Sequence, residues 1–371
     1  MTMAAGSRRP VLIMAGGTGG HVFPALAVAN ELTALGVPVS WLGTRQGLEA
    51  RVVPAAGYSL ATIRVSALRG KGLLRKFLAP LMLTLALWQT LIVFLRLRPA
   101  AVLGMGGFVA GPGGVTAWLL RRPLLIHEQN AVPGNTNRLL APLARRVMEG
   151  FPGSFPAGRH AVHTGNPVRA DIIALPLPEE RFTTRDAALR LLVVGGSLGA
   201  QALNEAVPQA IGQLPEHERP LIHHQTGVAG MAAVQAGYRD VVSDARVEAF
   251  INDMAAAYAW ADLVVCRSGA LTVAELAAAG VASVLVPFPY AVDDHQTANA
   301  SHLVRAGAAI LVPQTELTAA ALAEILARFN NKRAALLDMA RVARSLARPD
   351  AARQVADLCL EAAGYTTGAT A

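Results

Sequence analysis

The sequence predicts an α/β protein of two domains, each with a mainly parallel sheet. Strand-like and helix-like stretches alternate along its 371 residues, which is typical of parallel sheets joined by crossover helices. This length also favours two domains, and either half is long enough to bury a core of its own. An apolar run that ends in a glycine-glycine-hydroxyl turn occurs in both halves, from Val11 to His21 (VLIMAGGTGGH) and from Leu191 to Ala200 (LLVVGGSLGA).

The two glycine turns predict binding of an anion. Glycine adopts positive φ and lets a ligand approach the backbone, and the N–H groups and positive end of the following helix attract negative charge. A plain strand-to-helix connection would explain either turn alone, but Thr18 and Ser197 take matching places in both. The segment GMGGFV, residues 104–109, lacks the last glycine or alanine of a dinucleotide fingerprint, and no turn continues as Gly-Lys-Ser/Thr. We therefore expect a phosphate-bearing substrate in a cleft that the two domains share.

The first half predicts alternating strands and helices. Val11 to Ala15 is the expected first buried strand, because glycines interrupt this apolar run before the core of a signal peptide could form. A helix is expected from Pro24 to Leu35, closed by Gly36. The further expected elements are a strand from Val37 to Leu42, a third glycine-rich turn at residues 104–114 after the strand-like AVLGM, and the strand-like LLIHEQN at residues 124–130.

The segment from Phe77 to Leu95 (FLAPLMLTLALWQTLIVFL) contains no charged residue, and its length would allow a bilayer span. Its basic flanks are Lys71, Arg75, Lys76, Arg96 and Arg98. It lies between the strand-like ATIRV and AVLGMGG, where a crossover helix belongs, and a span there would divide the sheet. We expect a crossover helix with surplus apolar surface, ringed by basic residues, that docks on an anionic membrane. A fully covered core helix is the alternative.

A linker separates the two halves. Gly, Asn and Pro in VHTGNPVRAD, residues 162–171, favour a turn, and the second half starts at Leu189 with strand, turn and helix. In ADLVVCRSGALTVAELAAAG, a strand precedes a Ser268 cap and a helix from Ala270 to Ala279 that Gly280 ends. The remaining expected elements are the strand VASVLVP, the loop FPYAVDDHQ, a helix that ends near Gly307, and a last helix from Pro349 to about Ala363.

The charge balance indicates a membrane surface as a partner. The formal net charge is +8 and the pI about 10.2, although only 16% of residues are charged and 53% are hydrophobic. No aromatic residues are interleaved with the basic ones, so we expect an anionic membrane and no nucleic acid. A general role in solubility is the alternative. Cys266 and Cys359 lie far apart, which implies no disulfide framework and fits a reducing cytoplasm.

The order of the motifs resembles one family. The segments that carry the resemblance are GGTGGHVFPALA, GMGGFVAGPGG, HEQNAVPGNTN, TGNPVR, GGSLGAQALN, CRSGALTVAELAAAG and DDHQTANA. Over roughly residues 10 to 360 the chain is similar to the MurG family of bacterial glycosyltransferases, which have the GT-B fold. The resemblance implies two Rossmann-like domains that face a cleft. Residues 7–168 would bind acceptor and membrane, residues 169–348 would bind UDP-N-acetylglucosamine (UDP-GlcNAc), and a helix at 349–363 would return to the first domain.

The resemblance also implies a reaction in cell-wall synthesis. Members of the family move N-acetylglucosamine (GlcNAc) from UDP-GlcNAc to the C4 hydroxyl of N-acetylmuramic acid (MurNAc) in lipid I. The anomeric carbon inverts and lipid II forms for peptidoglycan. The implied location is the cytoplasmic face of the inner membrane, with other cell-wall synthesis proteins as candidate partners. We expect no cofactor or metal, because the sequence contains no Asp-x-Asp and helix N-termini with backbone amides can neutralise the departing UDP.

On the acceptor side, the resemblance assigns roles to two segments. The residues that line the cleft in the family pattern are Thr18, Gly19 and Gly20, although generic turn residues would look the same. His21 is the first candidate for general base, since an imidazole of near-neutral pKa can accept the hydroxyl proton. Capping or a phosphate contact is its alternative role. Glu128 is the rival base and Asn130 resembles a ligand of the donor sugar, but either would also serve to hold its loop.

On the donor side, three separate positions match the family pattern. Arg169 suits a nucleotide diphosphate because its guanidinium is fixed and always charged, with an interdomain salt bridge as the alternative. Ser197 would donate a hydrogen bond to a phosphate, or only cap its helix. The backbone of Ile251 would contact uracil, unless this residue only packs in the core.

The SGALTVAE segment is the sharpest candidate site. The expected helix start that would meet phosphate consists of Ala270, Leu271, Thr272, Val273 and Ala274. Glu275 would accept both ribose hydroxyls, or else form a capping box after Thr272. Gln296 resembles the residue that reads the sugar hydroxyls, with Asn299 as second choice because the preceding loop departs from the family form. Adjacent Asp293, Asp294 and His295 are a poor metal site, since three neighbours in a loop do not easily point at one ion.

Other functions remain as alternatives. Two enzymes would share many of these features: a UDP-sugar transferase with another glycolipid or natural-product acceptor, and a UDP-GlcNAc 2-epimerase, which needs neither an acceptor nor a membrane dock. The basic-flanked apolar helix favours a lipid acceptor. A non-catalytic membrane scaffold would have no reason to keep Arg169, Ser197, Glu275 and Gln296 together.

Overall fold

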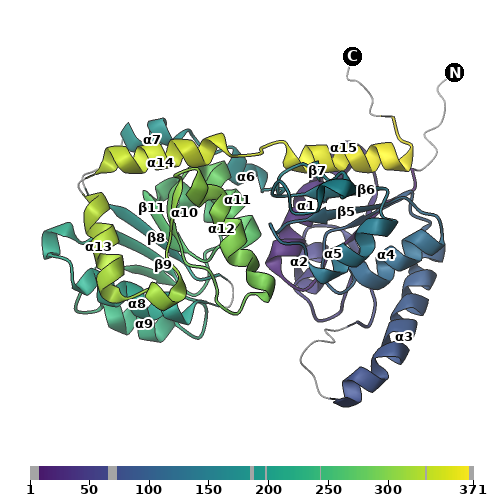
Figure 1. Ribbon diagram of the computed structural model, residues 1–371, viewed down its shortest axis with the longest axis horizontal. Coiled ribbons are helices and arrows are strands. Elements are labelled where there is room, and N and C mark those ends of the chain that lie inside the picture. The colour runs from purple at the N-terminus through teal and green to yellow at the C-terminus, as the bar shows by residue number, and fades with distance from the viewer. Residues whose placement is uncertain are drawn as a thin grey trace. The chain divides into compact units, whose positions relative to one another are not determined.

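Each half of the chain folds around its own parallel sheet. A computed structural model describes residues 8–65, 73–183, 188–196, 199–242, 244–330 and 332–366, and Figure 1 labels most of its helices and several of its strands. One compact unit comprises the chain through Arg169 together with the segment from Pro349, and the other runs from Ala170 to Arg348. The predicted α/β class with two parallel sheets is confirmed.

The described part of the first unit contains a seven-stranded parallel sheet in the order β3-β2-β1-β4-β5-β6-β7. The strand order reverses between β1 and β4, and ligands of such sheets bind at the carboxyl ends of the strands at this point. Its elements are β1 (Val11–Met14), α1 (Gly19–Ala34), β2 (Val39–Gly43), α2 (Glu49–Ala55), β3 (Ser59–Thr62), α3 (Leu73–Leu97), β4 (Ala101–Gly104), α4 (Ala110–Leu119), β5 (Leu124–Glu128), α5 (Asn135–Leu140), β6 (Arg146–Glu149), β7 (Val162–His163), α15 (Ala351–Ala363), and the 3-10 helices Ala141–Leu143 and Ala157–Arg159.

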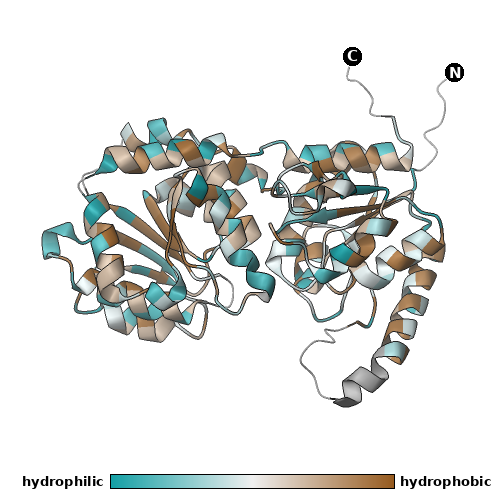
Figure 2. Ribbon diagram, in the orientation of Figure 1, coloured by the Kyte–Doolittle hydropathy of each residue, from teal (hydrophilic) through white to brown (hydrophobic). Residues whose placement is uncertain are grey.

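Helices cover both faces of this sheet. Alternate residues of a strand point to opposite faces, and Val11 and Ile13 of β1 pack with α1 and α15, while Leu12 and Met14 pack with α3 and α4. Figure 2 shows these strands as largely hydrophobic. The last helix, α15, lies beside α1 in Figure 1 and buries Val355 in their shared cluster. The predicted return of the C-terminal helix to the first domain is therefore confirmed.

The helix α3 connects β3 to β4 within one sheet, so the predicted crossover helix is confirmed. Its window Pro80–Leu97 is long and apolar enough to span a membrane by length and composition, with a mean hydropathy of 1.7. However, both strands that it joins belong to the same sheet, which a span would separate. Phe94 and Thr90 are buried, whereas Leu81 is 67% and Trp88 60% exposed. Of the predicted basic flanks, Lys71 and the side chains of Arg75 and Lys76 lie outside the part of the chain that the structure describes.

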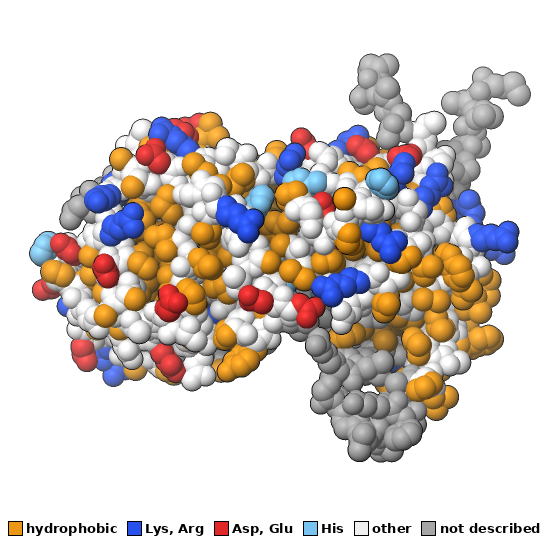
Figure 3. Space-filling view, in the orientation of Figure 1, with side chains coloured by type: hydrophobic (Ala, Val, Ile, Leu, Met, Phe, Trp, Pro, Cys, Tyr) orange, Lys and Arg blue, Asp and Glu red, His pale blue; other side chains and the backbone are white. Residues whose placement is uncertain are grey.

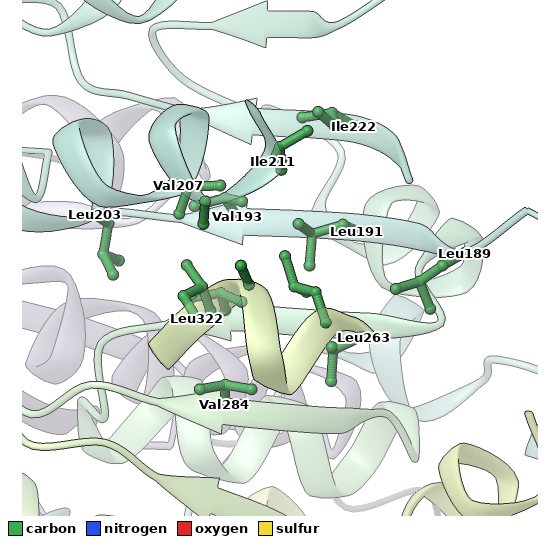
Figure 4. Close-up of a cluster of buried hydrophobic side chains, with 14 of the residues drawn as sticks. Leu189, Leu191, Val193, Leu203, Val207, Ile211, Ile222, Leu263, Val284 and Leu322 are labelled. Carbon is green, nitrogen blue, oxygen red and sulfur yellow. The ribbon is translucent and has the colours of Figure 1, made fainter. Parts of the chain in front are cut away.

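The described part of the second unit contains a six-stranded parallel sheet in the order β10-β9-β8-β11-β12-β13. Its order reverses between β8 and β11. Its elements are α6 (Ala170–Ile173), α7 (Pro178–Thr183), β8 (Arg190–Val194), α8 (Gln201–Gly212), β9 (Leu221–Gln225), α9 (Met231–Tyr238), β10 (Arg246–Glu248), α10 (Met254–Trp260), β11 (Leu263–Cys266), α11 (Ala270–Ala279), β12 (Ala282–Leu285), α12 (His295–Arg305), β13 (Ala309–Leu311), α13 (Ala319–Asn330), α14 (Arg333–Ser345), and the 3-10 helices Glu216–Glu218, Val292–Asp294 and Gln314–Glu316. Figure 4 shows Leu191 and Val193 of β8 gathered in one cluster with Val207 of α8 and Leu322 of α13.

Two helix starts differ from the sequence prediction. The first helix begins at Gly19 rather than at Pro24, because the carbonyl oxygen of Thr18 already accepts hydrogen bonds from His21 N and Val22 N. Pro24 in the sixth position forgoes one intrahelical hydrogen bond. The predicted Ser268 cap is wrong: the N-cap of α11 is Gly269 without a side-chain cap, and Ser268 Oγ has no hydrogen-bond partner among the described residues.

Candidate functional site

The first glycine turn connects β1 to α1 and places His21. Gly17 has φ +91, which glycine adopts readily. Thr18 is the N-cap, and its carbonyl oxygen accepts hydrogen bonds from the backbone N–H groups of His21 (3.1 Å) and Val22 (3.2 Å). The Thr18 hydroxyl oxygen lies 3.3 Å from His21 Nδ1. The turn therefore fixes the position of the imidazole at the start of the helix.

The turn after β4 packs against the His21 ring. Gly106 has φ +97, and a Cβ there would lie 2.6 Å from His21 Cδ2 and 2.8 Å from His21 Nε2. A Cβ on Gly107 would meet the carbonyl oxygen of Gly16. Both positions need glycine because the two turns approach too closely for a side chain. His21 thus sits where the carboxyl ends of the neighbouring strands β1 and β4 meet.

Glu49, to which the sequence pattern gave no role, supports the first glycine turn. Its buried carboxylate accepts hydrogen bonds at Oε2 from Gly17 N (3.0 Å) and at Oε1 from Thr44 N (2.9 Å) and Thr44 Oγ1 (2.8 Å). Burial raises the pKa of Glu49, but hydrogen bonds from Gly17 and Thr44 outweigh it, so the pKa is lowered. The N–H of Gly17, one of the amides that were expected to bind an anion, therefore already donates to a carboxylate. In the sequence, the only indication of this role is a glutamate that stands between glycines of loops. This pattern is too common to identify a residue that supports a turn.

Glu128 ends β5 and anchors the loop that follows. Its Oε1 accepts hydrogen bonds from Asn130 N (2.9 Å) and Nδ2 (3.1 Å). Its Oε2 accepts from Gly134 N (3.0 Å) and Asn137 Nδ2 (2.9 Å). These four donors occupy the lone pairs that a base would use on this buried carboxyl group. The geometry favours the loop-holding role for Glu128 and ties Asn130 to the same network.

The neighbouring His127 is a buried histidine of the core. Its Nε2 lies 2.9 Å from the Gly165 carbonyl oxygen and its Nδ1 lies 3.1 Å from Gln129 Nε2. Burial lowers the pKa of His127 to about 4, against a smaller opposite effect of the Gly165 hydrogen bond. The imidazole is therefore neutral near pH 7. Its contact with Gln129 helps to hold the loop that follows Glu128.

Two donor-side candidates lie apart from these turns in the sequence. Arg169 is half-buried and is the last residue of the first unit. Ser197 lies outside the described residues. Around it, Gly196 has φ +82 and Gly199 has φ +77, and a Cβ on Gly199 would meet the Thr226 carbonyl oxygen. The second turn is thus a tight glycine turn after β8, as predicted.

The N-terminus of α11 follows β11 at the strand-order reversal of the second sheet. The carbonyl oxygen of the N-cap, Gly269, accepts a hydrogen bond from Val273 N (3.0 Å). The predicted phosphate-facing residues, Ala270, Leu271, Thr272, Val273 and Ala274, all lie in its first one and a half turns. The first amides of a helix have no partner within it and carry its positive end. Glu275 follows in the same helix and is 8% exposed.

Three further candidates surround α11 or the strand edge near it. The N–H of the buried Ile251 donates to Gln225 Oε1 (3.1 Å). Gln296 is the second residue of α12, and its Oε1 accepts from Phe288 N (2.9 Å) in the preceding loop. The buried Asn299 donates through Nδ2 to the Ser268 carbonyl oxygen (3.2 Å). Asn299 therefore fastens α12 to the start of α11, whereas Gln296 holds the loop before it.

No metal-ligand cluster is found in the described part of the chain, where no group of three or more His, Cys, Asp and Glu side chains could hold an ion. Asp293 and Asp294 have φ of +54 and +48, and Asp294 is the N-cap of α12. The adjacent acidic pair thus forms the turn into this helix.

Comparisons with known proteins agree along the chain. Residues 11–149 match the glycosyltransferase family 28 N-terminal domain, and residues 190–355 match the glycosyltransferase family 28 C-terminal domain. Two relatives are named UDP-N-acetylglucosamine--N-acetylmuramyl-(pentapeptide) pyrophosphoryl-undecaprenol N-acetylglucosamine transferase. The one from Nitrosococcus oceani is 58% identical over 353 residues, 95% of this chain and 98% of its own. The one from Alkalilimnicola ehrlichii is 59% identical over 354 residues, 95% of this chain and 99% of its own. The crystal structure of Acinetobacter baumannii MurG is 44% identical, with a TM-score of 0.81 and coverage of 95% and 99%.

Proposed function

The chain belongs to glycosyltransferase family 28 and to its MurG group, and we propose that it transfers GlcNAc from UDP-GlcNAc to lipid I, forming lipid II for peptidoglycan. The observation that carries this function is the similarity through both units. Relatives named for this reaction are 58% and 59% identical over 95% of the chain. This extent favours the lipid I transferase over an enzyme that shares only the fold.

The second unit binds the donor. The N-terminal amides of α11 that belong to Ala270, Leu271 and Thr272 bind the diphosphate, since a helix N-terminus supplies unbonded N–H groups and a positive potential. Val273, whose N–H donates to Gly269, and Ala274 complete this first part of the helix. The Glu275 carboxylate accepts hydrogen bonds from the ribose hydroxyls, and the backbone of Ile251 contacts the uracil. Gln296 binds the hydroxyls of the sugar.

Two further groups complete the donor site. Arg169 contributes a fixed positive charge to the diphosphate, and Ser197 donates a hydrogen bond to a phosphate from the second glycine turn. Both act on charge that increases as UDP departs, so they stabilise the transition state more than the bound substrate.

The first unit positions the acceptor hydroxyl and its base. The His21 imidazole takes the proton from the C4 hydroxyl of MurNAc while that oxygen attacks the anomeric carbon of GlcNAc. The bond from this carbon to the β-phosphate oxygen breaks, UDP leaves, and the configuration inverts from α to β. The contact of Thr18 with His21 Nδ1 and the packing of Gly106 against the ring hold the imidazole in one orientation. Thr18, Gly19 and Gly20 line the acceptor side, and Glu128 with Asn130 shapes the adjacent loop.

The leaving group is stabilised by backbone amides and cationic side chains without a metal. This part of the proposal rests on the α11 N-terminus and Arg169. Turnover of the purified enzyme should be equal in EDTA and in Mg²⁺. Abolition of turnover by EDTA would show that this part of the mechanism is wrong.

An apolar patch on the first unit docks on the membrane. The patch consists of the exposed side chains of α3 and α4, namely Leu81, Leu83, Leu85, Trp88, Leu95, Trp118 and Leu119. Exposed Arg96, Arg98 and Arg121 lie at the ends of the two helices. Figure 3 shows hydrophobic side chains gathered on this side of the unit, with basic ones at its margin. Apolar area with flanking cations is what an anionic bilayer surface binds.

The enzyme is accordingly a peripheral membrane protein at the cytoplasmic face of the inner membrane, where a lipid-linked acceptor and a soluble nucleotide sugar meet. Other cell-wall synthesis proteins are the partners that this location makes accessible. Its acceptor stays in the bilayer, and the patch brings the His21 turn to that acceptor.

The direct test uses labelled UDP-GlcNAc with and without a lipid I analogue. We expect UDP release and a product heavier than the analogue by one GlcNAc residue only when the acceptor is present. Interconversion of UDP-GlcNAc without acceptor would indicate an epimerase, and an absence of transfer to lipid I with transfer to another glycolipid would indicate a different acceptor. Either result would overturn the proposed function.

A further inference from the structure

A buried phenol contacts the carboxylate proposed to bind ribose. Tyr258, in α10, donates a hydrogen bond from its hydroxyl to Glu275 Oε2 in α11 over 3.1 Å. Tyr258 is 1% exposed and Glu275 is 8% exposed. The phenol therefore contacts Glu275 from the protein interior, and its proton is shared with one carboxylate oxygen.

One arginine is hydrogen-bonded to both helices. Arg181 of α7 donates from Nη1 to the Tyr258 carbonyl oxygen (3.1 Å). Through Nη2 it also donates to the carbonyl oxygens of Ala279 and Gly280 (2.6 Å each), at the end of α11. The cation thus joins the carboxyl ends of α10 and α11, where helix dipoles favour positive charge. This contact links the two helices that carry Tyr258 and Glu275.

We infer that Tyr258 is a positioning residue for donor binding, which orients the Glu275 carboxylate toward the ribose of the nucleotide. The inference rests on the proposed role of Glu275. A carboxylate rotates about the bonds of its flexible stem unless a neighbour fixes it, and each fixed rotor lowers the entropy lost on binding. A neutral donor suits this task because it fixes the carboxylate and leaves its negative charge available to the ribose hydroxyls.

Glu275 is almost fully enclosed, with 8% of its surface exposed. A buried charge is costly unless it is hydrogen-bonded. The Tyr258 phenol supplies one such bond in the structure.

Tyr258→Phe tests the inference because it removes only the phenol oxygen. We expect the Kd for UDP and the KM for UDP-GlcNAc to rise about tenfold, the usual effect of a lost hydrogen bond to a charged group. The kcat should change by less than about twofold, since chemistry at His21 is untouched. Tyr238→Phe is a matched control: Tyr238 is also buried, and its hydroxyl lies 2.9 Å from His224 Nδ1 in another part of the same unit. The control should keep the parental Kd.

A second nucleotide separates positioning from a general structural effect. The probe 2′-deoxy-UDP lacks one of the two ribose hydroxyls that would donate a hydrogen bond to Glu275. Tyr258→Phe should therefore weaken 2′-deoxy-UDP binding by a smaller factor than it weakens UDP binding. Equal factors for the two nucleotides, or an unchanged Kd for UDP, would contradict the inference.

Variants of Glu275 distinguish this inference from the proposed function. If Glu275→Gln weakens UDP binding and a folded Tyr258→Phe does not, the positioning role is refuted and the donor site stands. If Glu275→Gln binds UDP as the parent does, the ribose role fails and the inference with it. Should Tyr258→Phe not fold, Glu275→Asp, which draws the carboxylate away from the phenol by one methylene, should weaken UDP about tenfold. Parental affinity in that variant would refute the inference.

Discussion

The substitution Gly106→Ala should displace the imidazole of His21 and slow catalysis without weakening donor binding. The new Cβ would lie 2.6 Å from His21 Cδ2, whereas ordinary contacts begin at 3.4 Å, so the ring must move by about 0.8 Å. A misplacement near 1 Å costs about 10²-fold in rate when it affects a reacting group, or about 2.7 kcal/mol. We therefore expect kcat with a lipid I analogue to fall about 10²-fold.

Gly57→Ala controls for backbone strain in this experiment. Gly57 has φ +85, close to the φ +97 of Gly106, but a Cβ there meets nothing within 4 Å. Both variants should lose similar stability, about 1 to 3 kcal/mol, because alanine is strained at positive φ. Only Gly106→Ala should lose kcat, and both should bind UDP as the parent does in calorimetry. A parental kcat in Gly106→Ala, or an equal loss of kcat in Gly57→Ala, would refute the inference that the packing of Gly106 against the His21 ring matters for catalysis.

Three more predictions concern the loop anchor, the membrane and acid stability. Glu128→Gln should lower the free energy of unfolding by about 3 kcal/mol, because an amide nitrogen would face donors that now reach the carboxylate; parental stability in urea with lost kcat would instead favour Glu128 as the base. Leu81→Gln should weaken binding to vesicles that contain anionic phospholipid about tenfold. The control is Leu177→Gln, which changes an exposed leucine outside the apolar patch and should leave this binding unchanged. Equal effects of the two substitutions in vesicle sedimentation would exclude the patch as the surface that docks on the membrane. His127 has its pKa lowered by burial to about 4 from 6.5, so the unfolded state binds more protons between these values and stability falls as the pH drops through this window. Between pH 7 and 5 the free energy of unfolding should fall by about 2 kcal/mol more in the parent than in His127→Gln, and equal falls in the two proteins would argue against a buried neutral imidazole.

Local patterns in the sequence predicted most of the fold. The alternation of strands and helices predicted both sheets, and the place of the apolar segment between two strands identified α3 as a crossover. Gly36 and Gly280 were predicted to end helices, and both have positive φ, +69 and +62. These features depend on neighbours along the chain, which a single sequence contains.

Features that depend on contacts between distant segments were not predicted. The position of the His21 ring requires a glycine at residue 106. Gly106 lies beside the ring because β1 pairs with β4. Glu49 contacts Gly17 across 32 residues and Tyr258 contacts Glu275 from another helix, and neither residue belongs to a recognisable motif. The Ser268 cap failed for a related reason, since the chain before α11 turns at Gly269 and buries the serine.

The central claim is a division of labour in which the second unit holds the donor and His21 of the first unit activates the acceptor hydroxyl. It is tested most directly by measuring UDP affinity and kcat with a lipid I analogue in His21→Ala and Glu275→Ala. We predict that Glu275→Ala loses UDP affinity, while His21→Ala keeps parental affinity and loses mainly kcat. Equal loss of UDP binding in both variants would contradict the account and remove His21 from the role of base.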